Sequence, residues 1–187
     1  KGKVIAFEPD IKNRVILEKN ISKEKLKNVI IIPKGLWDKN TVLFMDSLNV
    51  NSNVFDKEGS QPIEVVRLDD ELKKLNLSKI DFIKMDLQGA EGQAVKGMVK
   101  LLKKYKDIKI IEEFFPIGLE KSGVSPKEHL SLLIKLGFKL YEINEQENKI
   151  EESSISRLLE KYPPLDFKFG KKNFENILCL RESDFAI

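Results

Sequence analysis

The stretch IDFIKMDLQGAE at residues 80–91 carries the pattern that decides the fold. It opens with a short apolar run, Ile80–Met85, which is typical of a buried strand and ends at the carboxylate of Asp86. A polar turn containing Gly89 comes next, and then apolar residues recur at the spacing of one helix face: Ala94, Val95, Met98, Leu101, Leu102 and Tyr105. Strand, turn and helix in this order predict an α/β unit.

The same pattern recurs on both sides of this stretch. Val4–Phe7 is a short strand-like run that ends at Glu8, and Asp10 is a good N-cap for the helix that follows. Val29–Ile32 completes a strand–helix–strand unit, and its continuous apolar run predicts a strand covered on both faces. Further along, Ile108–Ile111 reads as another buried strand. We therefore predict an α/β fold with a Rossmann-like, doubly wound and mostly parallel sheet.

The remaining segments are predicted from shorter signals. Two strands are expected at Thr41–Met45 and Ile63–Arg67, and the polar segment Asp46–Pro62 between them reads as an exposed loop. Asp69 is expected to cap the next helix. The last two strands are expected at Lys139–Ile143 and Ile177–Leu180, with helices after the Ser125–Glu128 capping box and around Ile155–Tyr162.

Composition limits the class of protein. The 187 residues predict a single domain, residues 1–187, and the 41% of hydrophobic residues are enough for one core. No apolar run reaches the roughly 18–20 residues that cross a bilayer, and the start of the chain does not resemble a signal peptide, so we expect a cytoplasmic protein without a membrane partner. The net charge is only +3 and the basic residues are nearly all Lys, so nucleic acid is not an expected partner.

The lone histidine and the lone cysteine predict no chemistry. His129 lies in the first turn of a capped helix, and a single His cannot build a His-rich metal site. Cys179 reads as a small buried hydrophobic residue, without a partner for a disulfide or a cysteine zinc site. We expect no metal site.

The candidate functional residues follow the predicted strands, because ligands of doubly wound sheets bind at the carboxyl ends of the strands. Glu8, Asp86 and Glu113 each follow a strand, and Gly35-Leu36 follows another. Glu8 is the clearest case, because a carboxylate at the end of the first strand of a strand–helix–strand unit can accept hydrogen bonds from both ribose hydroxyls of a nucleotide cofactor. This feature alone does not separate an NAD-type cofactor from S-adenosylmethionine.

Two segments, Val4–Pro9 and residues 80–91, strongly resemble the FkbM-type methyltransferases. The likeness continues in the family's order through Asn20, Leu68-Asp69 and Glu113-Phe114-Phe115-Pro116, and reaches Asn176-Ile177-Leu178. The resemblance implies a sheet of the class I methyltransferase type with an antiparallel last strand. It also implies an S-adenosylmethionine-dependent O-methyltransferase that acts on a hydroxyl of a small molecule or a sugar.

The resemblance also implies roles for individual residues. Glu8 would bind the ribose of the cofactor, and Gly35 and Leu36 would lie against the adenine. Asp86 would be the catalytic residue, as a general base or a substrate-positioning group; holding Mg²⁺ or capping the amides of residues 89–91 are its alternatives. Glu91 and Glu113 would bind the substrate, a small-molecule or glycan acceptor, with simple structural roles left open for both.

Two departures from the family pattern set further expectations. Gln88 stands where the family usually has Glu, and no glycine-rich loop with its strand precedes Lys1. We expect the domain to be incomplete at its N-terminus, with about 20–80 further residues, the size of a strand–loop–helix unit. Their strand would lie between Val4–Phe7 and Ile80–Met85. A non-catalytic binding or scaffold module of the same fold, and an NAD-type oxidoreductase, remain as alternatives.

Overall fold

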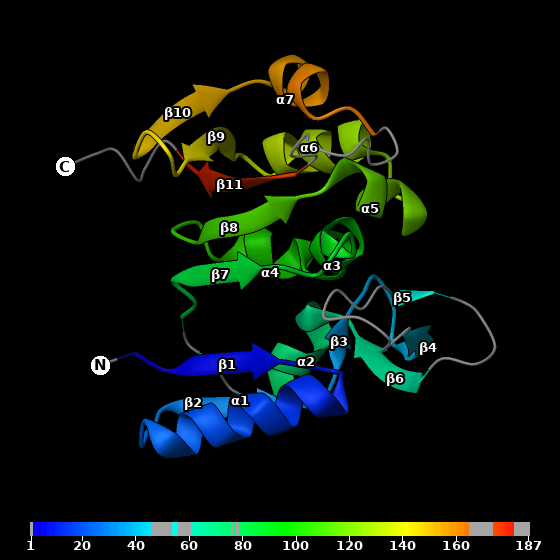
Figure 1. Cartoon of the computed structure of the whole chain (residues 1–187), viewed down its shortest axis with the longest axis vertical. Helices are drawn as coiled ribbons and strands as arrows, with labels where there is room; N and C mark the ends of the chain where they lie inside the picture. Colours follow the sequence, from blue (N-terminus) through cyan, green and yellow to red (C-terminus); the bar gives the residue numbers. More distant parts are fainter. Residues whose placement is uncertain are drawn as a thin grey trace.

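Three β-sheets and the helices around them make up the described part of the chain (Figure 1). The computed structural model describes residues 2–45, 54–55, 61–75, 77, 79–164 and 174–181. Within these residues no helix combines the length and the apolar character needed to cross a membrane.

The first sheet contains the predicted strand–helix–strand unit. β1 (Val4–Phe7) and β2 (Val29–Ile32) pair in parallel and are joined by α1 (Ile11–Lys23). Asp10 caps α1 as predicted, because its carboxylate accepts the N–H groups of residues 12 and 13. No residue of α1 is buried, and Ile30 of β2 remains 36% exposed. The prediction that β2 is covered on both faces is therefore wrong, because the described residues leave part of this unit uncovered.

The second sheet has five strands in the order β10-β9-β11-β8-β7. β7 and β8 are parallel, whereas the other neighbours are antiparallel, so the predicted antiparallel last strand is confirmed by β11. The register pairs Met85 with Glu112, so Asp86 and Glu113 follow at the same level of adjacent strands. The bounds are β7 (Phe82–Met85), β8 (Lys109–Phe114), β9 (Lys139–Asn144), β10 (Lys149–Ser153) and β11 (Glu175–Leu180).

The third sheet has the order β3-β6-β4-β5. β3 (Gly35–Leu36) pairs in parallel with β6 (Gln61–Val66), which pairs antiparallel with β4 (Thr41–Met45). The short β5 (Val54–Phe55) pairs with β4, so the prediction of a loop over the whole of residues 46–62 is wrong at these two residues and at the start of β6. Residues 46–53 and 56–60 of that predicted loop lie outside the described part.

The fold is mixed α/β, and the prediction of one mostly parallel sheet needs correction. Only the pairs β1–β2, β3–β6 and β7–β8 are parallel among the described strands. β1 and β7 point the same way in Figure 1, yet they do not pair with each other and so belong to separate sheets. The two strands cannot pair because a cavity, described below, lies between them.

The long helix predicted through Ala94 and Tyr105 is two helices, α3 (Glu91–Gly97) and α4 (Val99–Lys104). Gly97 lies so close to another segment that a Cβ on it would be 2.0 Å from the carbonyl oxygen of Trp37. The helix axis breaks here, and the periodicity of the apolar residues continues across the break because both helices bury the same side against the core.

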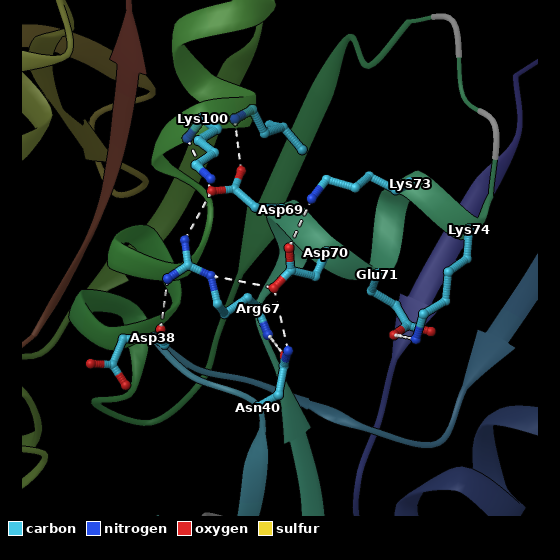
Figure 2. A network of polar contacts seen from close by, with 10 residues as sticks. Asp38, Asn40, Arg67, Asp69, Asp70, Glu71, Lys73, Lys74 and Lys100 are labelled. Atoms are coloured by element: carbon cyan, nitrogen blue, oxygen red, sulfur yellow. Dashed lines mark hydrogen bonds and ion pairs between the residues drawn. The ribbon is translucent and has the colours of Figure 1, made fainter.

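Asp69 holds the start of α4 rather than the start of its own helix (Figure 2). It lies inside α2 (Leu68–Lys74), whose N-cap residue is Arg67. The buried Asp69 carboxylate accepts the N–H groups of Lys100 at 3.1 Å and of Leu101 at 2.8 Å, and the Arg67 guanidinium donates to it at 3.3 Å. The prediction that Asp69 caps its own helix is wrong because the unpaired amides of a helix 30 residues away are within reach.

The remaining helices are α5 (Pro116–Lys121), α6 (Pro126–Lys135) and α7 (Ile155–Lys161). Ser125 is the N-cap residue of α6, but its side chain makes no capping hydrogen bond, so the predicted capping box does not form. The main core lies between the helices and the five-stranded sheet and includes Met98, Leu102, Ile110, Phe114, Leu130, Leu133 and Ile177. Cys179 is buried in this core as predicted.

Candidate functional site

A cavity of about 380 Å³ lies where β1, β3 and β7 end. Its lining includes Glu8, Gly35, Leu36 and Asp86, which come from three separate places in the sequence. The arrowheads of β1, β7 and β8 in Figure 1 point to the same side of the molecule, where the β3–β6–β4–β5 sheet begins. The carboxyl edge of parallel strands is where ligands of α/β proteins bind, so this cavity is the candidate site.

Glu8 follows β1 and is partly buried at the cavity wall. Its Oε1 atom accepts the N–H of Asp10 at 2.8 Å, which fixes the carboxylate, whereas Oε2 accepts no hydrogen bond from any described residue. Burial raises the pKa of Glu8, and the Asp10 N–H opposes this shift because it stabilises the charged form. One oxygen of a fixed carboxylate is therefore available to hydroxyl groups of a ligand.

The opposite wall of the cavity is apolar. It is lined by Leu36 of β3 and by residues of the antiparallel pair β4 and β6: Met45, Ile63 and Val65. Gly35 is buried beside them, and a Cβ at this position would lie 3.0 Å from Cγ1 of Val65. A larger residue at Gly35 would push into this pair of strands, so glycine brings the backbone close to the cavity. Such a wall suits a flat apolar group such as an adenine ring.

Asp86 follows β7 and is half exposed at the cavity. Its Oδ1 atom accepts a hydrogen bond from Nε2 of Gln88 at 2.8 Å, and Oδ2 lies 3.5 Å from the ammonium of Lys84. The same Nε2 donates to Oε2 of Glu113 at 3.2 Å. Two carboxylates from adjacent strand ends thus meet at one amide group, next to the cavity.

Glu91 lies below this group and does not line the cavity. Its side chain is fully buried, Oε1 accepts the N–H of Leu87 at 2.6 Å, and Oε2 accepts the N–H of Gly89 at 2.9 Å. Of the amides of residues 89–91, which the sequence offered Asp86 to cap, that of Gly89 is bound by Glu91. Burial raises the pKa of Glu91 to about 8, against the opposing effect of hydrogen bonds from its own backbone amide and from that of Leu87. A direct contact between Glu91 and substrate stays a prediction.

A second buried acid lies beneath the site, paired with the lone histidine. Nε2 of His129 and Oε1 of Glu112 are 2.5 Å apart, and both side chains are fully buried. Burial lowers the pKa of His129, but the charge of Glu112, its hydrogen bond and the charge of Glu91 together outweigh burial, so the pKa is raised. This pair joins α6 to β8, the strand that also carries Glu113.

A second cavity, of about 660 Å³, separates β1 from β7. Residues 3–7 line one side and residues 79–85 line the other, and the apolar side chains of Leu68 and Leu72 contribute to its lining. Phe7, Leu36 and Leu87 line both cavities, so the two spaces adjoin. The expected position of a further strand, between Val4–Phe7 and Ile80–Met85, is therefore a cavity in this structure.

Three polar residues of the candidate site were not predicted from the sequence as site residues. Asp10, Asn13 and Gln88 all line the first cavity. Asp10 carried only the signal of a helix cap, and Asn13 lies one helical turn further on. The bridging contact of Gln88 depends on Glu113, 25 residues away, so local sequence could not indicate it. Within the described ranges, no three His, Cys, Asp or Glu side chains gather as metal ligands would.

The comparisons with known proteins agree on one family. The family model described as the methyltransferase FkbM domain matches residues 1–140. A crystal structure of methyltransferase FkbM from Methylobacillus flagellatus superposes with a TM-score of 0.53 over 95% of this chain, at 14% sequence identity. This chain covers 36% of the length of that protein, and the superposition shows a likeness of fold. Among curated proteins, none matches the sequence.

Proposed function

The chain belongs to the methyltransferase FkbM domain family, and we propose that it transfers the methyl group of S-adenosylmethionine to a hydroxyl of a small molecule or sugar. One observation carries the proposal. Glu8, the pair Gly35-Leu36 and Asp86, which come from three distant parts of the sequence, line one cavity at the carboxyl ends of β1, β3 and β7.

The residues present fit the cofactor. The available oxygen of Glu8 would accept hydrogen bonds from the ribose hydroxyls, and the apolar wall of Leu36, Ile63 and Val65 would contact the adenine. Carboxylates line this cavity at Glu8, Asp10 and Asp86, which suits a ligand that carries a positive charge on sulfur.

Asp86 and Glu113 would act on the acceptor. S-adenosylmethionine, when bound, supplies a methyl group on a sulfonium that is open to attack by an oxygen nucleophile. A hydroxyl is a weak nucleophile at neutral pH, so the Asp86 carboxylate would accept its proton as a general base during the attack. Glu113, held to the same Gln88 amide, would accept a hydrogen bond from the acceptor and orient it.

The finer fold assignment is part of the proposal. We infer that a further parallel strand in the cavity between β1 and β7 would join these strands into one Rossmann-like sheet of the class I methyltransferase type. Each of the two strands is hydrogen-bonded on one side only in the described structure, to β2 and to β8 respectively. A strand from residues that precede Lys1 in a longer polypeptide is the proposed occupant.

Calorimetry with S-adenosylhomocysteine tests the cofactor assignment. We expect the whole protein to bind it, and Glu8→Ala to weaken binding by about 1.5–3 kcal/mol, the range for losing hydrogen bonds to a charged group. Glu160→Ala, an exposed glutamate on α7, is the matched control and should bind as the wild type does. Binding of NAD in place of S-adenosylhomocysteine would favour an oxidoreductase, and binding of neither would favour a non-catalytic module.

A further inference from the structure

The turn between β7 and α3 is fixed from several directions. Gln88 and Gly89 have φ angles of 53° and 101°, in the left-handed region that side chains other than glycine rarely adopt. The Glu91 carboxylate accepts the N–H groups on both sides of Gln88, and the hydroxyl of Ser122 donates to the carbonyl of Gly89 at 2.8 Å. A Cβ on Gly89 would lie 2.3 Å from the backbone of Gly118, so α5 closes the turn from the other side.

This backbone conformation determines where the Gln88 side chain lies. Its single Nε2 group donates to Oδ1 of Asp86 and to Oε2 of Glu113, and so uses both of its hydrogens on two carboxylates. The positive φ of Gln88 turns the residue back toward Asp86 and Glu113, the two carboxylates that its amide contacts. Two carboxylates at adjacent strand ends repel each other, and a neutral double donor between them offsets that repulsion.

We propose that Gln88 is a positioning residue, which holds the carboxylate of Asp86, in the lining of the first cavity, and that of Glu113, bonded to the same amide, in one fixed arrangement. The effect of this positioning on catalysis rests on the proposed function, since a general base must be held in one geometry relative to the acceptor hydroxyl. The structural part is independent of it: without the amide, Asp86 is half exposed and has only the ammonium of Lys84, at 3.5 Å, as a described partner.

The side-chain rotamer of Asp86 provides the test. In the whole protein, three-bond couplings to the Asp86 carboxyl carbon should report one χ1 rotamer. Gln88→Met keeps the length of the side chain and removes both donors, so the couplings should become averaged over rotamers. Gln88→Glu replaces the donor with a third carboxylate and should also remove the single rotamer. Gln146→Met and Gln146→Glu, in the exposed turn between β9 and β10, are the matched controls and should leave the couplings unchanged.

Each outcome decides the question. Averaged couplings in the wild type, or couplings that stay unchanged in both Gln88 variants, would overturn the proposal. A loss of the dispersed backbone spectrum in Gln88→Met would show that the residue is needed for folding, and Gln88→Glu, which keeps the size and polarity, would then decide. Binding of S-adenosylhomocysteine is measured in parallel on each variant. Loss of the rotamer with unchanged affinity supports the positioning role, whereas absent binding in the wild type counts against the proposed function alone.

Discussion

Asp86 combines two properties that a general base requires, since it faces a cavity and its carboxylate is held by a neighbouring donor. We predict that Asp86→Asn leaves the fold and the affinity for S-adenosylhomocysteine nearly unchanged and lowers methyl transfer at least ~10²-fold, as for the loss of a positioned base. The check is the rate of S-adenosylhomocysteine formation with an acceptor for which the wild type is active. Wild-type turnover in Asp86→Asn would mean that Asp86 has no part in proton transfer.

Glu91 is buried at 0% exposure and its pKa is raised to about 8, so the folded protein binds a proton there that the unfolded chain releases near pH 4.5. Stability from this group is fully present at low pH and is lost as the pH rises from about 4.5 to about 8. We predict that Glu91→Gln, which stays neutral, becomes more stable relative to the wild type over this range.

Urea unfolding of both proteins at several pH values between 5 and 8.5 measures this difference in the free energy of unfolding. The raised pKa of His129 also makes stability fall as the pH rises above its ordinary value; the larger part of this rise comes from Glu112 and is present in both proteins, and only the part that comes from the charge of Glu91 is removed in Glu91→Gln. Parallel curves for Glu91→Gln and the wild type would contradict the prediction.

At the scale of elements, the start of α4 depends on one side chain from another helix (Figure 2). We predict that Asp69→Ala lowers the free energy of unfolding by about 1–3 kcal/mol, because two helix N–H groups and the Arg67 guanidinium lose a buried acceptor. The adjacent Asp70 is the matched control, since its ion pairs with Arg67 and Lys73 are more exposed and its replacement by Ala should cost clearly less than that of Asp69. Equal losses in the two variants would argue against the capping role.

Local patterns predicted most elements, and contacts between distant segments explain the exceptions. β1 and β2 begin and end where the apolar runs do. The break between α3 and α4 was not predictable, because it follows from the approach of Gly97 to Trp37 and from Asp69. Arg181 is a similar case: its guanidinium donates to the carbonyls of Leu102 and Leu136, two helix ends far away in sequence.

The candidate site follows the same division. Glu8, Gly35, Leu36 and Asp86 were predictable as cavity residues because each follows an apolar strand-like run in the sequence, and the cavity does bring these four together although β1, β3 and β7 belong to separate sheets. The hydrogen bonds that Glu91 accepts from the turn before it were not predictable. An acid in the first turn of a helix has the same sequence signal whether it faces a ligand or a buried turn. The bridge made by Gln88 depends on the pairing of β7 with β8, which only the folded chain provides.

At the scale of the whole molecule, the unit of β1, α1 and β2 has the weakest support. α1 buries no residue, and β1 and β2 pair only with each other among the described strands. We predict that backbone amides of this unit exchange with solvent faster than those of β8, which has strands on both sides and a fully buried core. Hydrogen exchange followed by NMR or mass spectrometry measures this directly. Protection of α1 equal to that of β8 would show that the molecule opens only as one unit.

Glu8 follows β1 and Asp86 follows β7, and both line the first cavity, although the two strands belong to sheets that share no hydrogen-bonded strand pair in the described part of the chain. A ligand that contacts both residues would thus connect two sheets that are not hydrogen-bonded to each other. Its affinity includes the free energy needed to hold those sheets at one spacing, in addition to the contacts it makes. The affinity for such a ligand is therefore expected to depend on the spacing of the two sheets, and a substitution at Leu72, which lines the cavity between β1 and β7 but not the candidate site, is expected to change affinity through that spacing.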